Sequence, residues 1–200
     1  MFISKLSIDF FILAIKYIKT MNKGIQFTKI RKVKSPNRAN SHDAGTDFFI
    51  PEYTDSFLKD LMKKNTSNKV FYQPIIDETG NEALEIILAP HAQINIPSGI
   101  KVNILDKNTY LDANNKSGVA TKYRLVVGAK VIDAGYQGEI HLNLINTSEE
   151  NVTIRSGQKI VQFIHKEYID TQWEEITNDQ YDQIEVSDRG TGGFASTGEK

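Results

Sequence analysis

The sequence predicts an all-β domain, a sandwich or jelly roll, with one short helical insertion. Short apolar runs rich in Val and Ile recur between residues 25 and 165. Turn signals made of Gly, Pro, Asn or Asp separate these runs at intervals of roughly eight to twelve residues, a spacing typical of sandwiches and barrels. Residues 54–65 are the stretch with helical periodicity.

The expected elements follow in chain order. Residues 25–33 form a first strand, 35–41 a loop and 48–50 a short strand. The helix at 54–65 begins with Thr54 or Asp55 as its N-cap. Four apolar side chains share one helix face: Phe57, Leu58, Leu61 and Met62. Further strands are expected at 70–72, 75–76, 84–88, 94–96, 100–105, near 110, and at 126–132, 140–145, 152–154 and 160–165.

Composition limits the classes of function. The chain has 200 residues, 40% of them hydrophobic, and a formal net charge of −1. This near neutrality predicts neither nucleic acid nor membrane as a partner. The absence of cysteine excludes disulfides, thiol nucleophiles and thiolate zinc. The four histidines (His42, His91, His141 and His165) lack metal-ligand spacing.

Residues 1–24 are expected to lie outside the fold. An apolar stretch at 8–18 is interrupted by Asp9 and Lys16, is too short to span a bilayer and lacks a signal-peptide cleavage site. We interpret it as a dispensable extension upstream of Met21. A membrane-surface or partner helix is the alternative.

A candidate general base lies in the centre of the chain. Apolar runs flank a turn of sequence DAGY at 133–136, and Asp133 is where the first run ends. A carboxylate at a strand end, beside Tyr136 and two mobile glycines, suits proton transfer. The alternative is a turn aspartate that caps its own backbone.

The glycine-rich end of the chain suits a phosphate ligand. Residues 188–198 read DRGTGGFASTG. Consecutive amide groups there can wrap a phosphate chain, Arg189 adds a bidentate cation, and Phe194 can stack on a base. The relaxed dinucleotide fingerprint at Gly190, Gly192 and Ala195 is rejected, because no helix can follow it. A disordered terminus is the alternative.

Together these stretches resemble the homotrimeric, all-β dUTPase family. Five motifs occur in the family's order: AGTDF at 44–48, KSGVA at 116–120, GAKVIDAGYQGEI at 128–140, GQKIVQFI at 157–164 and RGTGGFASTG at 189–198. The resemblance implies a jelly-roll-like sandwich or distorted barrel at 25–187, with an insertion at about 54–83 and a flexible glycine-rich arm at 188–200.

Three residues depart from the family pattern. Lys116 replaces the usual Arg, which keeps the charge and loses the planar fork. Lys130 replaces a small residue, and Ala195 replaces a glycine. The insertion is interpreted as a surface or partner-binding elaboration.

The resemblance implies hydrolysis of dUTP to dUMP and pyrophosphate, which limits uracil in DNA and supplies dUMP for dTTP synthesis. Asp133 would activate a water for attack on the α-phosphorus, and Mg²⁺ would be held through the triphosphate and waters rather than directly by the protein. Tyr136 would pack on the deoxyribose and exclude a 2′-hydroxyl. A β-hairpin backbone around 127–131 would recognise the uracil edge.

The remaining implied contacts come from all five motifs. Asp47 would support the metal's waters or the tail arginine, with a turn-stabilising aspartate as the alternative. The implied substrate-binding residues are Lys116, Ser117, Gly118 and Gln162 at the phosphates; Ala129, Lys130 and Val131 at the base; and Arg189, Gly193, Phe194, Ser196 and Thr197 in the closing tail.

Two other functions stay open. A dCTP deaminase on this fold needs a Glu ten residues after the motif Asp, and Asn143 occupies that position. A catalytically idle, dUTPase-like nucleotide-binding regulator is the second alternative, motivated by the insertion and the extension. The resemblance also implies a homotrimer with sites shared between subunits, in the cytoplasm or, for a viral protein, inside the host cell.

Overall fold

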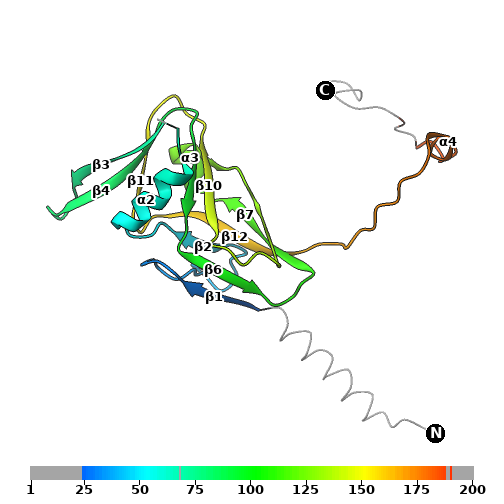
Figure 1. Ribbon diagram of the computed structural model, residues 1–200, viewed down its shortest axis with the longest axis horizontal. Coiled ribbons are helices and arrows are strands. Elements are labelled where there is room, and N and C mark those ends of the chain that lie inside the picture. Colours follow the sequence, from blue (N-terminus) through cyan, green and yellow to red (C-terminus); the bar gives the residue numbers. More distant parts are fainter. Residues whose placement is uncertain (1–23, 68, 188–189, 191–200) are drawn as a thin grey trace, which may run out of the picture. The chain divides into compact units, whose positions relative to one another are not determined.

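The computed structural model in Figure 1 describes residues 24–67, 69–187 and 190. The chain divides into two units after Tyr168. The first unit is built from antiparallel strands, and so the all-β prediction is confirmed. No helix among the described residues is long and apolar enough to cross a membrane.

The strands of the first unit form four small sheets. The strand orders are β1-β6, β5-β10-β8, β11-β4-β3 and β2-β12-β7-β9. Their bounds are β1 Ile25–Lys29, β2 Thr46–Phe49, β3 Val70–Ile76, β4 Glu82–Leu88, β5 Gln93–Pro97, β6 Ile100–Ile104, β7 Thr109–Asn115, β8 Leu125–Val127, β9 Val131–Asp133, β10 His141–Asn146, β11 Val152–Arg155 and β12 Lys159–Glu167.

Branched aliphatic side chains from all four sheets fill one core. Ile86, Ile94, Ile104 and Ile140 are among its fully buried members. Their β-branched side chains suit the pleated inner faces of strands, which explains why the apolar runs form strands. This packed core fixes the loops that follow β7, β8 and β9.

Helix α2 (Asp55–Lys64) matches the predicted helix closely. The Thr54 hydroxyl accepts a hydrogen bond from the Phe57 amide at 3.2 Å, so Thr54 is the N-cap. Phe57, Leu58 and Leu61 are buried, while Met62 is only partly buried. The helix covers β5.

Two strand predictions need correction. Residues 127–131 do not form a hairpin: β8 pairs with β10 and β9 pairs with β7, in different sheets. The chain changes sheets here because the Lys130 carbonyl already accepts the Ala113 amide of β7 at 2.7 Å. Strand β3 runs unbroken through Pro74, which an edge strand tolerates.

Two short helices were not predicted. Helix α3 (Ser117–Tyr123) buries only Val119, so it lacks an amphipathic pattern. Helix α4 (Asn178–Tyr181) lies in the second unit, where Thr177 and Gln180 form a capping box. All but Gly24 of the predicted extension at 1–24, and all but Gly190 of the predicted arm at 188–200, lie outside the described residues.

Candidate functional site

The third motif forms one side of a small pocket. Strand β9 ends at Asp133, and the Tyr136 amide then donates to the Asp133 carbonyl at 3.0 Å to close a turn. The pocket has a volume of about 260 Å³. Its lining residues are Asn95, Ala129, Val131, Ile132, Asp133, Tyr136 and His141. We call it the nucleoside pocket, because its volume and its aromatic wall suit one base and its sugar.

Asp133 presents a free carboxylate to this pocket. Its side chain is exposed and makes no hydrogen bond or ion pair with the described residues. Its backbone is fixed by the ladder with β7, where it lies opposite Tyr110. A carboxylate held on a strand end with both oxygens open can accept a proton from a bound water.

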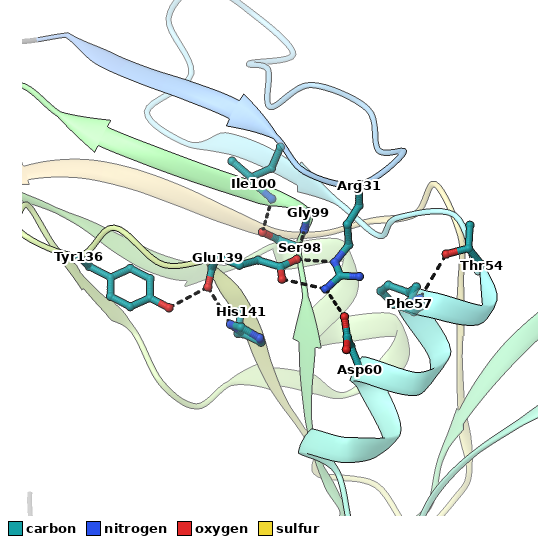
Figure 2. Close-up of polar contacts among 10 residues, drawn as sticks. All are labelled: Arg31, Thr54, Phe57, Asp60, Ser98, Gly99, Ile100, Tyr136, Glu139 and His141. Atoms are coloured by element: carbon teal, nitrogen blue, oxygen red, sulfur yellow. Dashed lines mark hydrogen bonds and ion pairs between the residues drawn. The ribbon is translucent and has the colours of Figure 1, made fainter.

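Tyr136 forms the aromatic wall. Its hydroxyl donates to the Glu139 carbonyl at 2.9 Å (Figure 2), and its ring is 42% exposed. A Cβ on Gly138 would lie 2.4 Å from the phenolic oxygen, so any other residue there would displace the ring from this position. The ring therefore has one supported orientation.

His141 forms the back of the pocket in its neutral form. Nδ1 lies 2.8 Å from the Glu139 carbonyl, which can only accept, so Nδ1 carries the proton. Nε2 is buried and has no partner within the described residues. Burial lowers the pKa of His141, and the nearby charge of Lys64 lowers it further.

Asn143 fixes the chain that carries Ala129. Its Oδ1 accepts from the Ala129 amide at 3.0 Å, and its carbonyl accepts from the Gly128 amide at 3.1 Å. A Cβ on Gly128 would meet Oδ1 at 2.1 Å. The position that a deaminase needs as a glutamate is therefore a buried structural amide.

Some backbone groups of this segment remain open. Within the described residues, the Lys130 amide and the carbonyls of Gly128 and Ala129 make no hydrogen bond. The Lys130 ammonium lies 3.7 Å from the buried Asp112. One free donor and two free acceptors beside a pocket can pair with the edge of a planar base.

The first, second and fourth motifs line a separate polar pocket of about 250 Å³. Its polar lining includes Asp43, Asp47, Lys116, Lys159 and Gln162, and we call it the phosphate pocket. Asp47 is buried and pairs with Lys116 and, at 3.3 Å, with Lys159. The buried Asp47 carboxylate therefore holds two ammonium groups side by side at this pocket.

Glycine and backbone contacts shape the rest of this pocket. The Gln162 Nε2 donates to the Asn115 carbonyl at 2.8 Å, and a Cβ on Gly45 would lie 2.1 Å from the Gln162 Oε1. Ser117 and Gly118 lie in the first turn of α3, whose N-cap is Lys116. These contacts place the first, second and fourth motifs together.

The two pockets are well separated within one chain. Asp133 lies opposite Tyr110 on one side of β7, and Gln162 lies opposite Asn114 on the other side. These positions on β7 are four residues apart (110 and 114), which is about 13 Å along a strand. One chain therefore does not bring Asp133 and Gln162 to one reacting atom.

Sequence reasoning missed four polar residues of these pockets, among them Asp43 of the phosphate pocket. Asn95 reaches the nucleoside pocket from β5, Lys159 reaches the phosphate pocket from β12, and His141 was seen only as an isolated histidine. Asn95 and His141 come from strands β5 and β10 and were given no role by a motif, whereas Lys159 lies within the fourth motif at 157–164 but was not singled out there. Five predicted residues (Arg189, Gly193, Phe194, Ser196 and Thr197) lie outside the described residues.

No group of three or more His, Asp or Glu side chains among residues 24–187 is arranged to hold a metal ion. The carboxylates near the pockets are instead single, as Asp133 is, or paired with lysines, as Asp47 is. Any divalent ion at this site needs ligands from elsewhere, and the oxygens of a polyphosphate suit magnesium.

Comparison with known proteins identifies relatives of the sequence. A family model described as dUTPase matches residues 82–198. A deoxyuridine 5′-triphosphate nucleotidohydrolase of Clostridium tetani is 32% identical over 167 residues, 82% of this chain and 89% of the relative. That of Candida albicans is 36% identical over 108 residues, 54% of this chain and 65% of the relative. The chain thus spans just under two thirds of this last relative's length.

Solved structures share the fold. The chain is similar to a dUTPase of Staphylococcus bacteriophage 80alpha, solved with dUPNHPP, with a TM-score of 0.64 and 20% identity. The match covers 88% of this chain and 99% of that one. A mutant of the dUTPase from phage phi11 of S. aureus, described with a structural Mg(II) ion, has a TM-score of 0.56 and 18% identity over 76% of this chain and 96% of that one.

Proposed function

The chain belongs to the dUTPase family, and we propose that it hydrolyses dUTP to dUMP and pyrophosphate. The free Asp133 carboxylate at the rim of the nucleoside pocket is the observation that carries this proposal. A proton acceptor that is held by strand pairing and left without a partner in the described chain is what hydrolysis requires.

In the proposed reaction, a water attacks the α-phosphorus. A new bond forms between the water oxygen and phosphorus, the bond to the bridging oxygen of the β-phosphate breaks, and pyrophosphate leaves with that electron pair. Asp133 takes the proton from the attacking water. Its fixed strand position would hold the water in line with the leaving group.

The nucleoside pocket would select uracil and deoxyribose. Uracil presents one N–H donor and two carbonyl acceptors, and the open groups at 128–130 offer both acceptors and a donor. Ala129 and Val131 would close around the base. The Tyr136 ring would pack on the deoxyribose and leave no room for a 2′-hydroxyl.

The phosphate pocket of one subunit would bind the triphosphate of a nucleotide whose base and sugar lie in the nucleoside pocket of a neighbouring subunit. Lys116, Ser117, Gly118 and Gln162 would contact the phosphate oxygens, and Asp47 would hold the ammonium groups of Lys116 and Lys159 toward them. The separation of Asp133 and Gln162 along β7 supports sites that are shared between copies. We therefore propose a homotrimer.

The tail would complete the site. Arg189, Gly193, Ser196 and Thr197 would close over the outer phosphates, and Phe194 would stack on the uracil and exclude water. This arrangement is carried over from the family motif at 189–198. It explains why a glycine-rich stretch would retain one arginine and one phenylalanine.

The proposed cofactor is Mg²⁺. The donor set fits an ion that arrives with the substrate: hard phosphate oxygens and waters are its preferred ligands, and the described carboxylates near the pockets are single or already paired. Bound in this way, the ion would supply charge neutralisation on the triphosphate. Asp47 would act on the phosphates through its two lysines.

A pyrophosphate-release assay tests the proposal. Purified protein with dUTP and Mg²⁺ should release pyrophosphate, and Asp133→Asn should reduce turnover at least about a hundredfold while dUTP binding stays within a few-fold, since Asn keeps the shape and cannot take a proton. Glu78→Gln, at the exposed β3–β4 turn, is the matched carboxylate-to-amide control and should retain parental turnover.

Three outcomes would contradict parts of this proposal. Tight dUTP binding by the parent without turnover would favour a nucleotide-binding regulator. Ammonia release from dCTP would favour a deaminase, which the structural role of Asn143 argues against. Turnover by Asp133→Asn above about a hundredth of the parental rate would remove Asp133 from the general-base role.

A further inference from the structure

We propose that helix α2, within the predicted insertion, sets the sugar selectivity of the nucleoside pocket by holding Tyr136 through Asp60, Arg31 and Glu139. This inference rests on the proposed function of that pocket. The sequence predicted that the insertion is a surface or partner-binding elaboration, whereas here its helix supports the pocket. Asp60, Arg31 and Asn65 are positioning residues in this account, because they act on the pocket only through other residues.

The first connection is an ion-pair chain (Figure 2). Arg31 donates through Nη2 to Asp60 Oδ2 of α2 at 2.7 Å. Arg31 also donates two hydrogen bonds to the Glu139 carboxylate, from Nε to Oε1 at 2.7 Å and from Nη2 to Oε2 at 3.0 Å. The Arg31 and Glu139 side chains are only 15% and 12% exposed, so these charge-assisted bonds are shielded from water.

Glu139 connects this ion-pair chain to Tyr136 and His141, two residues that line the pocket. Its carbonyl accepts both the Tyr136 hydroxyl and His141 Nδ1, and its Oε1 also accepts the Gly99 amide at 2.7 Å. Burial raises the pKa of Glu139, but hydrogen bonds from Arg31 and Gly99 outweigh burial and hold that pKa below its usual value. The residue is therefore a fixed anion whose position sets two pocket side chains.

The second connection joins the end of α2 to the opposite wall. Asn65, the buried C-cap, donates through Nδ2 to the Asn95 carbonyl at 3.0 Å and accepts the Asn95 amide through Oδ1 at 2.8 Å. Asn95 lines the pocket and lies opposite Asn143, which anchors Ala129. Both walls of the pocket are thus tied to one helix.

Selectivity against a 2′-hydroxyl depends on such support. The hydroxyl adds a single oxygen, so a ring that shifts by about 1 Å would admit the ribose. The Tyr136 ring is partly exposed and rests on a glycine, so its hydroxyl contact to Glu139 is its main polar restraint. Loosening Glu139 should therefore relax sugar selectivity more than it slows turnover.

Asp60→Ala is the decisive variant. Asp60 is 43% exposed, so its removal leaves no buried void, while Arg31 loses one of its two carboxylate partners. We expect the selectivity for dUTP over UTP, as a ratio of kcat/KM values, to fall roughly two- to thirtyfold. Asp55→Ala, on the same helix and outside this network, is the matched control and should keep the parental ratio.

A double-mutant cycle separates positioning from folding. In a Tyr136→Phe background the hydroxyl contact is absent, so Asp60→Ala should change the ratio little further. Asp60→Glu, which restores a carboxylate, should recover part of the lost selectivity. If Asp60→Ala lowers the dUTP/UTP selectivity ratio equally in the parent and in the Tyr136→Phe background, Asp60 does not act through the Tyr136 hydroxyl and the proposal is wrong.

The selectivity is also measured without turnover, as the ratio of Kd values for dUMP and UMP from calorimetry. A parent that binds both nucleotides but hydrolyses neither triphosphate would overturn the proposed function, and the Kd ratio would still test the helix. If Asp60→Ala leaves both ratios at the parental value while Tm falls, α2 supports only the fold and this inference is wrong.

Discussion

Tyr136 is held at its hydroxyl by Glu139, while much of its ring faces the nucleoside pocket. Tyr136→Ala should therefore enlarge the sugar side of the pocket and raise UTP hydrolysis relative to dUTP, by roughly tenfold or more in the ratio of kcat/KM values. Steady-state kinetics with both nucleotides measures this ratio. A ratio that stays unchanged would place discrimination against the ribose at another residue.

His141 should make folding stability depend on pH. Its folded pKa is lowered, by burial first and by the charges of Lys64 and Arg31, while Glu139 opposes this effect. The unfolded state takes up a proton near pH 6.5, so the stabilisation is complete above that pH and is lost as pH falls through the folded pKa. The urea midpoint should thus decrease from pH 7.5 to pH 5.

Two variants check the assignment to His141. His141→Asn should flatten this pH dependence, whereas His42→Asn, at an exposed loop position, should not. The lowered pKa values of Glu139 and Asp112 act in the same direction, but their effect lies in the acid range of carboxylates. An identical slope in parent and His141→Asn between pH 5 and 7 would contradict the prediction.

The sequence predicts the local parts of the site better than its long-range parts. Asp133 and Tyr136 are three residues apart, and a single turn places both at one pocket. Asn95 and Lys159 arrive through strand pairing, and the Asp47 ion pairs join residues more than 60 positions apart. No local pattern specifies the register that pairs strands, so Asn95 had no signal; the motifs contain Asp47, Lys116 and Lys159, but the sequence did not predict that these three residues pair.

Among the elements, α2 depends most clearly on its apolar face. Leu61 is fully buried, and Leu61→Ala should lower the free energy of unfolding by about 2–5 kcal/mol. Met62 lies on the same helix turn and is only partly buried, so Met62→Ala should lower the free energy of unfolding by less. Urea titration at pH 7.5 measures both, and an equal loss from the two variants would contradict the observed burial.

The accuracy of the element predictions follows from periodicity and length. Helix α2 has ten residues and a clear apolar face, so its bounds were predicted almost to the residue. Helix α3 has seven residues and one buried side chain, too little for a pattern. The run at 126–132 was interpreted as one strand because its two halves are equally apolar, although they join different sheets.

At the scale of the whole molecule, strand spacing predicted the fold class but not the sheet order. Pairings such as β1 with β6 and β11 with β4 join strands that are distant in sequence.

Assembly gives the last prediction, which tests whether the chains share their sites. A closed threefold ring uses one heterologous contact three times, so each proposed site combines Asp133 of one chain with Arg189 and Phe194 of another. One variant carries Asp133→Asn with an intact tail. The other ends before Asp188 and keeps Asp133. Each alone should be nearly inactive, because every one of its sites lacks the same part.

Unfolding the two variants together and refolding them should produce mixed trimers. With equal amounts and random mixing, an intact Asp133 meets an intact tail at about a quarter of the sites, so activity should rise to a similar fraction of the parental value. Mixing the folded variants without unfolding is the control and should show little activity. If co-refolding demonstrably mixes the chains and activity stays at the level of the two variants alone, the tail serves its own chain and the shared-site proposal fails.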